Sequence, residues 1–132
     1  MSPYAFGKTV SLPFDTAVQR ITDELAQVGF GVLTEIDVQA TMKKKLGQEM
    51  PPYRILGACN PALAFQALQR EDKIGTMLPC NVVVQELEPG RSEVAAIDPV
   101  ASMQAVENPD LGDVAQTVRA KLASMIERLK QA

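Results

Sequence analysis

The chain has 132 residues and a formal net charge of −3, with 46% hydrophobic and 22% charged residues, which is the balance of one globular domain. It contains no His, no Trp and two Cys. Without His, catalytic triads, Cys–His pairs and imidazole-based zinc sites are excluded. The acidic balance opposes binding to nucleic acid or to an anionic membrane, because both need a basic surface.

Localisation follows from features that the sequence lacks. No apolar run approaches the roughly 20 residues that span a bilayer, and the first residues show no basic segment followed by an apolar one, as a signal peptide would. Two Cys are too few for a disulfide-stapled secreted scaffold. We therefore expect a soluble cytoplasmic protein that forms one domain over residues 1–132.

The first elements are predicted by apolar spacing. Residues 4–10 read as a strand, and Pro13 then opens a helix whose apolar residues recur at helical spacing. Gly29 ends this helix as a left-handed cap. Residues 30–37 are rich in β-formers and predict the second strand.

Capping residues set the next boundaries. Asp37 can cap a short helix over residues 38–46. A pair of prolines breaks the chain before a third strand at 53–58. Asn60 followed by Pro61 is the pattern of an N-cap and a first-turn proline, so another helix starts there.

The remaining chain predicts a hairpin and a long helix. Strand signals run from about 75 to 87, residues 88–90 form a turn, and residues 92–98 return as the partner strand. Asn108 repeats the capping signature before a helix whose apolar positions extend to Leu129. The fold class is therefore α+β, with five or six strands and two long helices.

Two strands carry apolar residues on both faces. In residues 30–37, alternation predicts Leu33 on the face away from Phe30. In residues 80–87, it predicts Val83 and Leu87 on the face away from Val82. A sheet that is apolar on both sides needs cover on both sides, and two long helices shield only one. The second face predicts a ligand, short helices or a second subunit, and homodimerisation through the sheet is one hypothesis.

The two thiols occupy different contexts. Cys59 ends a strand immediately before the helix start, where the helix dipole lowers a thiol pKa. It can be a nucleophile, a redox thiol, a pocket residue or a small buried residue. Cys80 begins an apolar strand and reads as a core residue. A zinc site on two Cys would need carboxylates as well, so no metal and no cofactor are predicted.

Polar residues near these strand ends complete the candidate set. Lys45 lies on the flank of the short helix and can reach Glu35, either as a structural ion pair or within a polar pocket. Asn60 has a capping role. Asn81 lies in a strand that it does not favour, so we expect its amide to bond loop backbone or a ligand.

Four blocks of sequence, at 29–38, 44–47, 53–61 and 78–84, resemble the signature blocks of the domain of unknown function 302 family. The resemblance covers nearly the whole chain. It implies a single α+β domain of the TATA-binding-protein-like type, with helices on one side of a curved, mainly antiparallel sheet, and homodimers would be in character. The family supplies no activity, substrate or catalytic residue.

Three functions stay open. The favoured one is a non-enzymatic module that binds a small molecule or a protein partner, because polar residues in apolar elements need partners. The second is a thiol-dependent enzyme or redox protein that uses Cys59, with Cys80 as resolving thiol. The third is a structural domain that dimerises through its second sheet face. The candidate ligand-binding residues are Glu35, Lys45, Cys59, Asn60, Cys80 and Asn81.

Overall fold

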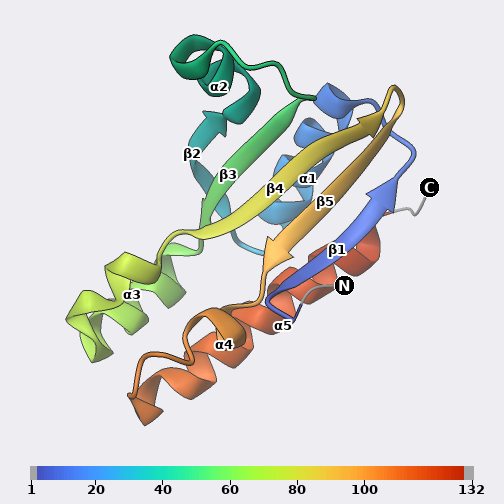
Figure 1. Ribbon diagram of the computed structural model, residues 1–132. Coiled ribbons are helices and arrows are strands. Elements are labelled where there is room, and N and C mark those ends of the chain that lie inside the picture. Colours follow the sequence, from blue (N-terminus) through green and yellow to red (C-terminus); the bar gives the residue numbers. More distant parts are fainter. Residues whose placement is uncertain (1–2, 130–132) are drawn as a thin grey trace.

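The computed structural model describes residues 3–129, in which one antiparallel sheet has the strand order β1-β5-β4-β3-β2 (Figure 1). Its strands are β1 (Ala5–Val10), β2 (Gly31–Asp37), β3 (Tyr53–Cys59), β4 (Cys80–Glu88) and β5 (Arg91–Ile97). The α-helices are α1 (Phe14–Gln27), α2 (Val38–Leu46), α3 (Pro61–Arg70), α4 (Pro99–Ser102) and α5 (Gly112–Arg128). Two 3₁₀ turns are η1 (Asp72–Met77) and η2 (Pro109–Leu111). The predicted α+β class is confirmed.

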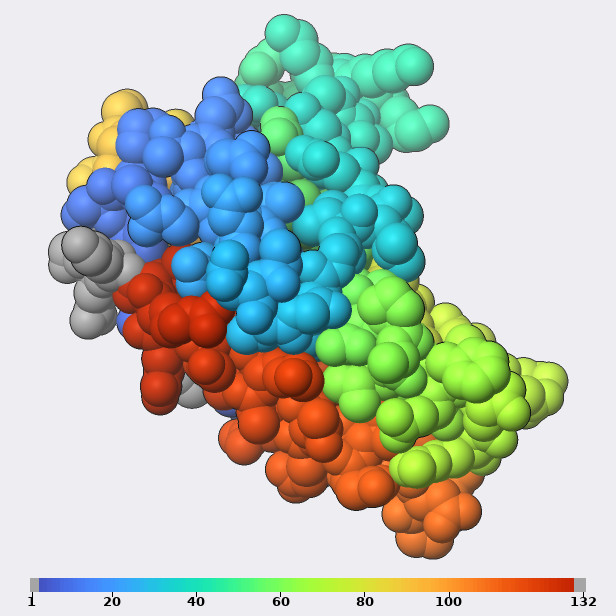
Figure 2. All heavy atoms as spheres, turned by 180° about the vertical axis from the view of Figure 1, so that it is seen from behind, coloured from blue at the N-terminus to red at the C-terminus, as the bar shows by residue number. Residues whose placement is uncertain are grey.

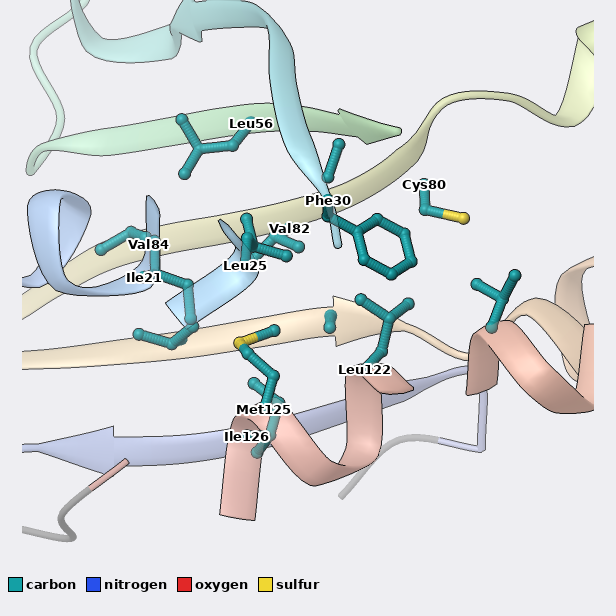
Figure 3. Close-up of a cluster of buried hydrophobic side chains, with 14 of the residues drawn as sticks. Ile21, Leu25, Phe30, Leu56, Cys80, Val82, Val84, Leu122, Met125 and Ile126 are labelled. Carbon is teal, nitrogen blue, oxygen red and sulfur yellow. The ribbon is translucent and has the colours of Figure 1, made fainter. Parts of the chain in front are cut away.

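The core lies between the sheet and the two long helices. Helices α1 and α5 cover the same face of the sheet, and their apolar stripes meet alternate residues of the strands, as helical and strand periodicity require (Figure 1). Figure 3 shows this layer of side chains, formed by Ile21 and Leu25 of α1, Leu122, Met125 and Ile126 of α5, and Val82 and Val84 of β4.

Helix boundaries follow the caps that the sequence predicts. The Asp37 carboxylate accepts a hydrogen bond from the Ala40 backbone N–H at 2.9 Å, and α2 ends at Gly47 in the left-handed conformation. The Asn60 side chain likewise caps α3. These motifs act within one helical turn, which explains why sequence alone located them.

The segment before β4 differs from the prediction. Residues 75–79 do not join the strand: Asp72–Met77 form the turn η1, and β4 begins only at Cys80. The Thr76 hydroxyl donates to the Lys73 carbonyl at 2.9 Å, which holds the turn locally. Pro79 has no N–H to offer a strand ladder, so pairing starts after it.

The orientation of β2 also differs from the prediction. The pairing of β2 with β3 shifts between Val32 and Thr34, so Leu33 is an extra residue in a β-bulge. The bulge directs Leu33 toward the helical side, and it places Ile36 opposite Ile55 on the other face. Strict alternation predicts Ile36 on the same face as Phe30 and Leu33 on the other face, because it assumes a regular ladder without a bulge.

The opposite face of the sheet is open. Within residues 3–129, no helix lies across it in Figure 1. Val83 pairs with Ile55 on one side and Ala95 on the other, and all three point to this face. Leu87 is 45% exposed but lies at a register shift between Glu86 and Glu88, so the alternation of β4 does not set its direction. The predicted apolar second face is therefore present in β4.

Candidate functional site

A cavity of about 320 Å³ lies at the end of the sheet where β3 finishes and β4 begins. Its walls come from these strand ends, from the inner side of α3 and from the first turns of α5. Figure 1 shows α3, α4 and the start of α5 extending beyond this end of the sheet. In Figure 2, α3 and α5 lie side by side on the outer surface, and residues of both helices line the cavity. We call it the strand-end cavity.

The wall of the strand-end cavity is almost entirely apolar. Leu63 and Ala67 of α3, Val114 and Val118 of α5, and Phe30 all line it. No Asp, Glu, Lys or Arg lines it. Ligand pockets in proteins typically measure about 300–1,000 Å³ and are mainly apolar, with few polar groups. This cavity fits that description.

Both thiols border this cavity. Cys59 is the last residue of β3 and Cys80 the first of β4, and the register pairs Cys80 with Ala58. Cys80 is 7% exposed. Its burial, and secondarily the charge of Cys59, raise the pKa of the Cys80 thiol to about 11. Because the thiolate is the reactive form, this weakens the prediction that Cys80 acts as a resolving thiol.

Asn60 lines the strand-end cavity as well as capping α3. Its Oδ1 accepts a hydrogen bond from the Leu63 backbone N–H at 3.3 Å. Gly29 adjoins it, with a φ of +87°, and a Cβ at Gly29 would lie 3.1 Å from Asn60 Nδ2. The end of α1 therefore packs closely against the start of α3, which positions one wall of the cavity.

Glu35 and Lys45 do not join this site. The predicted Glu35–Lys45 pair is wrong: Glu35 Oε1 accepts from Arg54 Nη1 at 3.0 Å, and Lys45 is exposed on α2. The reason is strand pairing, which sets Arg54 opposite Asp37 on the neighbouring strand, with Arg54 Nη2 3.5 Å from Asp37 Oδ2. The Arg54 guanidinium also lies 5.3 Å from the ring centre of Phe14.

Asn81 is separated from the strand-end cavity by the sheet itself. It is the residue after Cys80 and so points to the open face, opposite Gly57. There it borders a second cavity, of about 280 Å³, together with Tyr53, Val83 and Ile97. Of the six candidate residues, the structure brings together Cys59, Asn60 and Cys80.

Sequence reasoning missed most of the cavity wall. Strict alternation predicts Leu33 on the other face, and no local motif marks Ala67, Met103 or Val118 as residues of a cavity wall. The i, i+4 spacing of Leu63 and Ala67 does indicate one face of α3. Nothing local indicates that this face meets α5, because the two helices are far apart in the chain.

Among residues 3–129, no group of three or more His, Cys, Asp or Glu side chains could hold a metal ion. Over the same residues, none of the helices combines the length and the apolar character needed to cross a bilayer.

Together, fold and cavity define a small α+β domain with helices on one face of an antiparallel sheet. A family model described as "Domain of unknown function DUF302" matches residues 6–129, so the chain belongs to this family. The chain is also similar to a solved structure, the uncharacterized conserved protein DUF302 from Bacillus stearothermophilus, with 28% identity and a TM-score of 0.88.

That similarity covers 98% of this chain and 100% of the other. The predicted family resemblance is thereby confirmed. A comparison with curated proteins returned no match. The family description names no activity, and a shared fold does not by itself specify a function.

Proposed function

We propose that this protein is a binding module whose strand-end cavity takes a small, uncharged, largely apolar molecule. The observation that carries the proposal is a cavity of about 320 Å³ without a charged residue in its wall. At about 30 Å³ for each water-sized group, this volume accommodates roughly ten non-hydrogen atoms. Apolar cavities of this kind favour apolar occupants over water.

The chemistry of the wall argues for a neutral ligand. A buried charge costs several kcal/mol unless a partner offsets it, and the wall supplies no cation or carboxylate. Cys80 stays protonated at neutral pH, because burial and Cys59 raise its pKa to about 11. A ligand carboxylate or ammonium group would therefore have to remain outside the cavity.

The rim supports entry of an apolar molecule. Leu33 and Leu68 both line the cavity, yet they are 67% and 42% exposed. Each therefore has one part in the wall and another in solvent. An apolar molecule can pass between the β2 bulge and α3 without crossing a charged ring of side chains.

Binding of the neutral fluorescent molecule indole, which is small enough for this volume, tests the proposal, since the chain has no Trp to interfere. Ala64 of α3 lines the cavity, whereas Ala62 of the same helix is exposed and does not. We expect Ala64→Phe to fill the cavity and weaken probe binding by at least about tenfold, which is about 1.4 kcal/mol. Ala62→Phe is the matched control and should bind as the wild type does. Equal binding by both variants would contradict the proposal.

A second candidate function, as a homodimer, is favoured by the open face of the sheet. The central positions of this face carry no charge; they are Tyr53, Ile55, Val83 and Ala95. The solvated face of an antiparallel sheet usually carries polar residues instead. Glu93, beside them, accepts a hydrogen bond from Gln85 at 3.0 Å. Depletion of charge at the centre is typical of an interface.

The size of this face suits a two-fold contact. Five strands at about 4.8 Å spacing and six residues at about 3.3 Å span about 24 by 20 Å. Two such faces remove about 1,000 Å² from solvent, which is the lower bound for a specific interface. A face with few charges can also meet its own copy without strong like-charge repulsion.

Sedimentation equilibrium at micromolar protein tests the dimer. Val83→Glu places a charge at the centre of the open face, and we expect it to give a monomer. Leu46→Glu changes an apolar residue of α2 that is 67% exposed and off the sheet, and it should leave the mass unchanged. A monomeric wild type would rule the dimer out.

We also propose a reducing compartment, such as the cytoplasm, for this protein. Cys59 and Cys80 are both free thiols, although they lie on neighbouring strand ends. Free thiols persist where glutathione and thioredoxin systems keep them reduced.

A further inference from the structure

The second cavity, of about 280 Å³, opens on the face of the sheet that lies away from α1 and α5 (Figure 1). In β4 and β5, buried residues alternate with residues of this face. The register pairs Val83 with Ala95 and Gln85 with Glu93, so all four side chains stand on the same side of the sheet. All four line the cavity, which we call the open-face cavity.

Small residues leave room for the open-face cavity. Ala95 is paired with Val83 on one side and with Gly7 of β1 on the other. Because Ala95 has a single side-chain carbon and Gly7 has none, little fills the space above β5 at this point. Val83 and Ala95 form an apolar floor, which offers a surface for one side of a flat molecule.

One end of the open-face cavity is rich in hydrogen-bond acceptors. Gln85 Nε2 donates to Glu93 Oε1 at 3.0 Å, which leaves Gln85 Oε1 and Glu93 Oε2 as acceptors. Tyr53, paired with Gln85 on the other side, lines the same end. Among the described residues that line this cavity, only Glu93 carries a charge. This end therefore favours a ligand that donates hydrogen bonds, such as an amino group, and opposes an anion.

Asn81 borders the other end of the open-face cavity, and its side chain is exposed. Asn81 and Gln85 are four residues apart in β4, so their Cα atoms are separated by about 13 Å. Their side chains stand roughly perpendicular to the sheet. A hydrogen bond of about 2.9 Å at each end leaves about 7 Å, which is the length of a fused two-ring heterocycle. The Asn81 amide both donates and accepts, as recognition of the edge of such a ring requires.

We propose that the open-face cavity binds a planar nitrogen heterocycle of purine size that carries an amino group. The ring lies on Val83 and Ala95, Glu93 and Gln85 accept hydrogen bonds from the amino group, and Asn81 bonds the opposite edge. At about 30 Å³ for each water-sized group, the volume holds roughly nine non-hydrogen atoms, which is the size of such a ring system.

This site is complete within one chain and is separate from the strand-end cavity. It lies on the face proposed above for the dimer, so a second copy would compete with the ligand. Binding is therefore measured at sub-micromolar protein, where dissociation of any dimer is favoured.

The tyrosine fluorescence of the protein reports on this cavity directly. The chain has two Tyr and no Trp, and both Tyr4 and Tyr53 line the open-face cavity. We expect adenine to quench this fluorescence in a saturable way, after correction for its absorbance with free tyrosine. Purine, which lacks the amino group, should bind at least about tenfold more weakly, because a site built for a donor group rejects an analogue without it.

Two variants test the polar ends of the cavity. Glu93→Gln removes the carboxylate and keeps an oxygen for Gln85, and it should weaken adenine binding by at least about tenfold. Asn81→Ala truncates an exposed side chain and should also weaken binding. Glu88→Gln is the matched control, because it removes the same charge from an exposed residue of β4 that does not line the cavity. It should bind adenine as the wild type does.

Ala64→Phe, which fills the strand-end cavity, separates this proposal from the apolar-ligand proposal. It should lose affinity for indole and keep its affinity for adenine. Loss of adenine binding in this variant would place adenine in the strand-end cavity and overturn the assignment to the open face. Circular dichroism shows whether each variant is folded.

Three further results would overturn the inference: a wild type that shows no saturable quenching at millimolar adenine, equal affinities for adenine and purine, or equal affinities of Glu93→Gln and Glu88→Gln for adenine. Failure of indole to bind would contradict the apolar-ligand proposal alone, because indole binding is measured separately.

Discussion

At the scale of single residues, the buried thiol of Cys80 couples stability to alkaline pH. Burial, and then the charge of Cys59, raise its pKa from 9.0 to about 11 in the folded chain. Between these values the unfolded chain loses the proton while the folded chain keeps it. The free energy of unfolding therefore falls as pH rises from 9 to 11 and is unaffected below 9.

This coupling predicts a difference between the wild type and Cys80→Ala. Two pKa units correspond to about 2–3 kcal/mol, so the wild type should lose about this much more stability over the interval than the variant. Urea unfolding at a series of pH values measures it. Lysines and tyrosines titrate in both proteins and cancel in the difference. Parallel pH profiles would show that Cys80 is solvated in the folded state.

Gly57 is a second residue whose identity is set by close contacts. A Cβ at this position would collide with the Thr34 hydroxyl and would lie 2.8 Å from Pro79 Cγ. We expect Gly57→Ala to lower the free energy of unfolding by about 2 kcal/mol, as overpacking does. Gly31→Ala, in β2 with nothing within 4 Å, is the control and should not destabilise the fold. Equal denaturant midpoints would contradict this prediction.

At the scale of elements, α2 depends on its cap more than on packing. None of its residues is buried. The Asp37 side chain caps it at 2.9 Å, and Gln39 Nε2 donates to the Met50 carbonyl at 2.9 Å. The free energy of local opening of such a helix is lower than the free energy of unfolding of the core.

Asp37→Ala should therefore unfold α2 locally. The lost cap costs about 1 kcal/mol, and we expect faster hydrogen exchange of α2 amides with little change in exchange of β4 amides. Asp37→Asn keeps a capping oxygen but removes the charge near Arg54, so it separates the cap from the ion pair. If the α2 amides exchange faster in Asp37→Asn as well, although this variant keeps the capping oxygen, then the ion pair with Arg54 and not the cap holds α2.

At the scale of the whole molecule, the core between the sheet and the two long helices is one cooperative unit. Leu122 of α5 is fully buried in the same cluster as Ile21 and Leu25 of α1. Arg128 Nε donates to Glu24 Oε2 at 3.0 Å across the two helices. Helix α5 thus joins the first helix to the sheet.

We expect Leu122→Ala to lower the global free energy of unfolding by about 2–5 kcal/mol, because it leaves a cavity at the centre of this core. The transition should stay two-state, which coincident changes in far-ultraviolet circular dichroism and tyrosine fluorescence would show. Leu46→Ala, on the exposed face of α2, should change stability by no more than about 0.5 kcal/mol. If Leu122→Ala destabilises the protein no more than Leu46→Ala does, Leu122 does not lie at the centre of one cooperative core.

Local motifs account for what could be predicted. The cap at Asp37, the Asn60-Pro61 start of α3 and the glycine after α1 each act within a few residues, and all three lie where the sequence places them. Alternation failed in β2, because the bulge at Leu33 depends on how β2 pairs with β3. The predicted Glu35–Lys45 ion pair is wrong for a related reason, because the pairing of β2 with β3 brings Arg54 to Glu35.

The amino-acid sequence by itself determined the α+β class, the starts of α1, α2 and α3, the family and the exclusion of His-dependent chemistry, because these depend on composition and on neighbours in the chain. Only the tertiary structure decided which side chains share the strand-end cavity. Its walls come from segments as distant as Leu33 and Val118, and the approach of α3 to α5 reflects packing of the whole core. The physical reason is that contacts between distant segments depend on sheet register and helix packing, which no local pattern specifies.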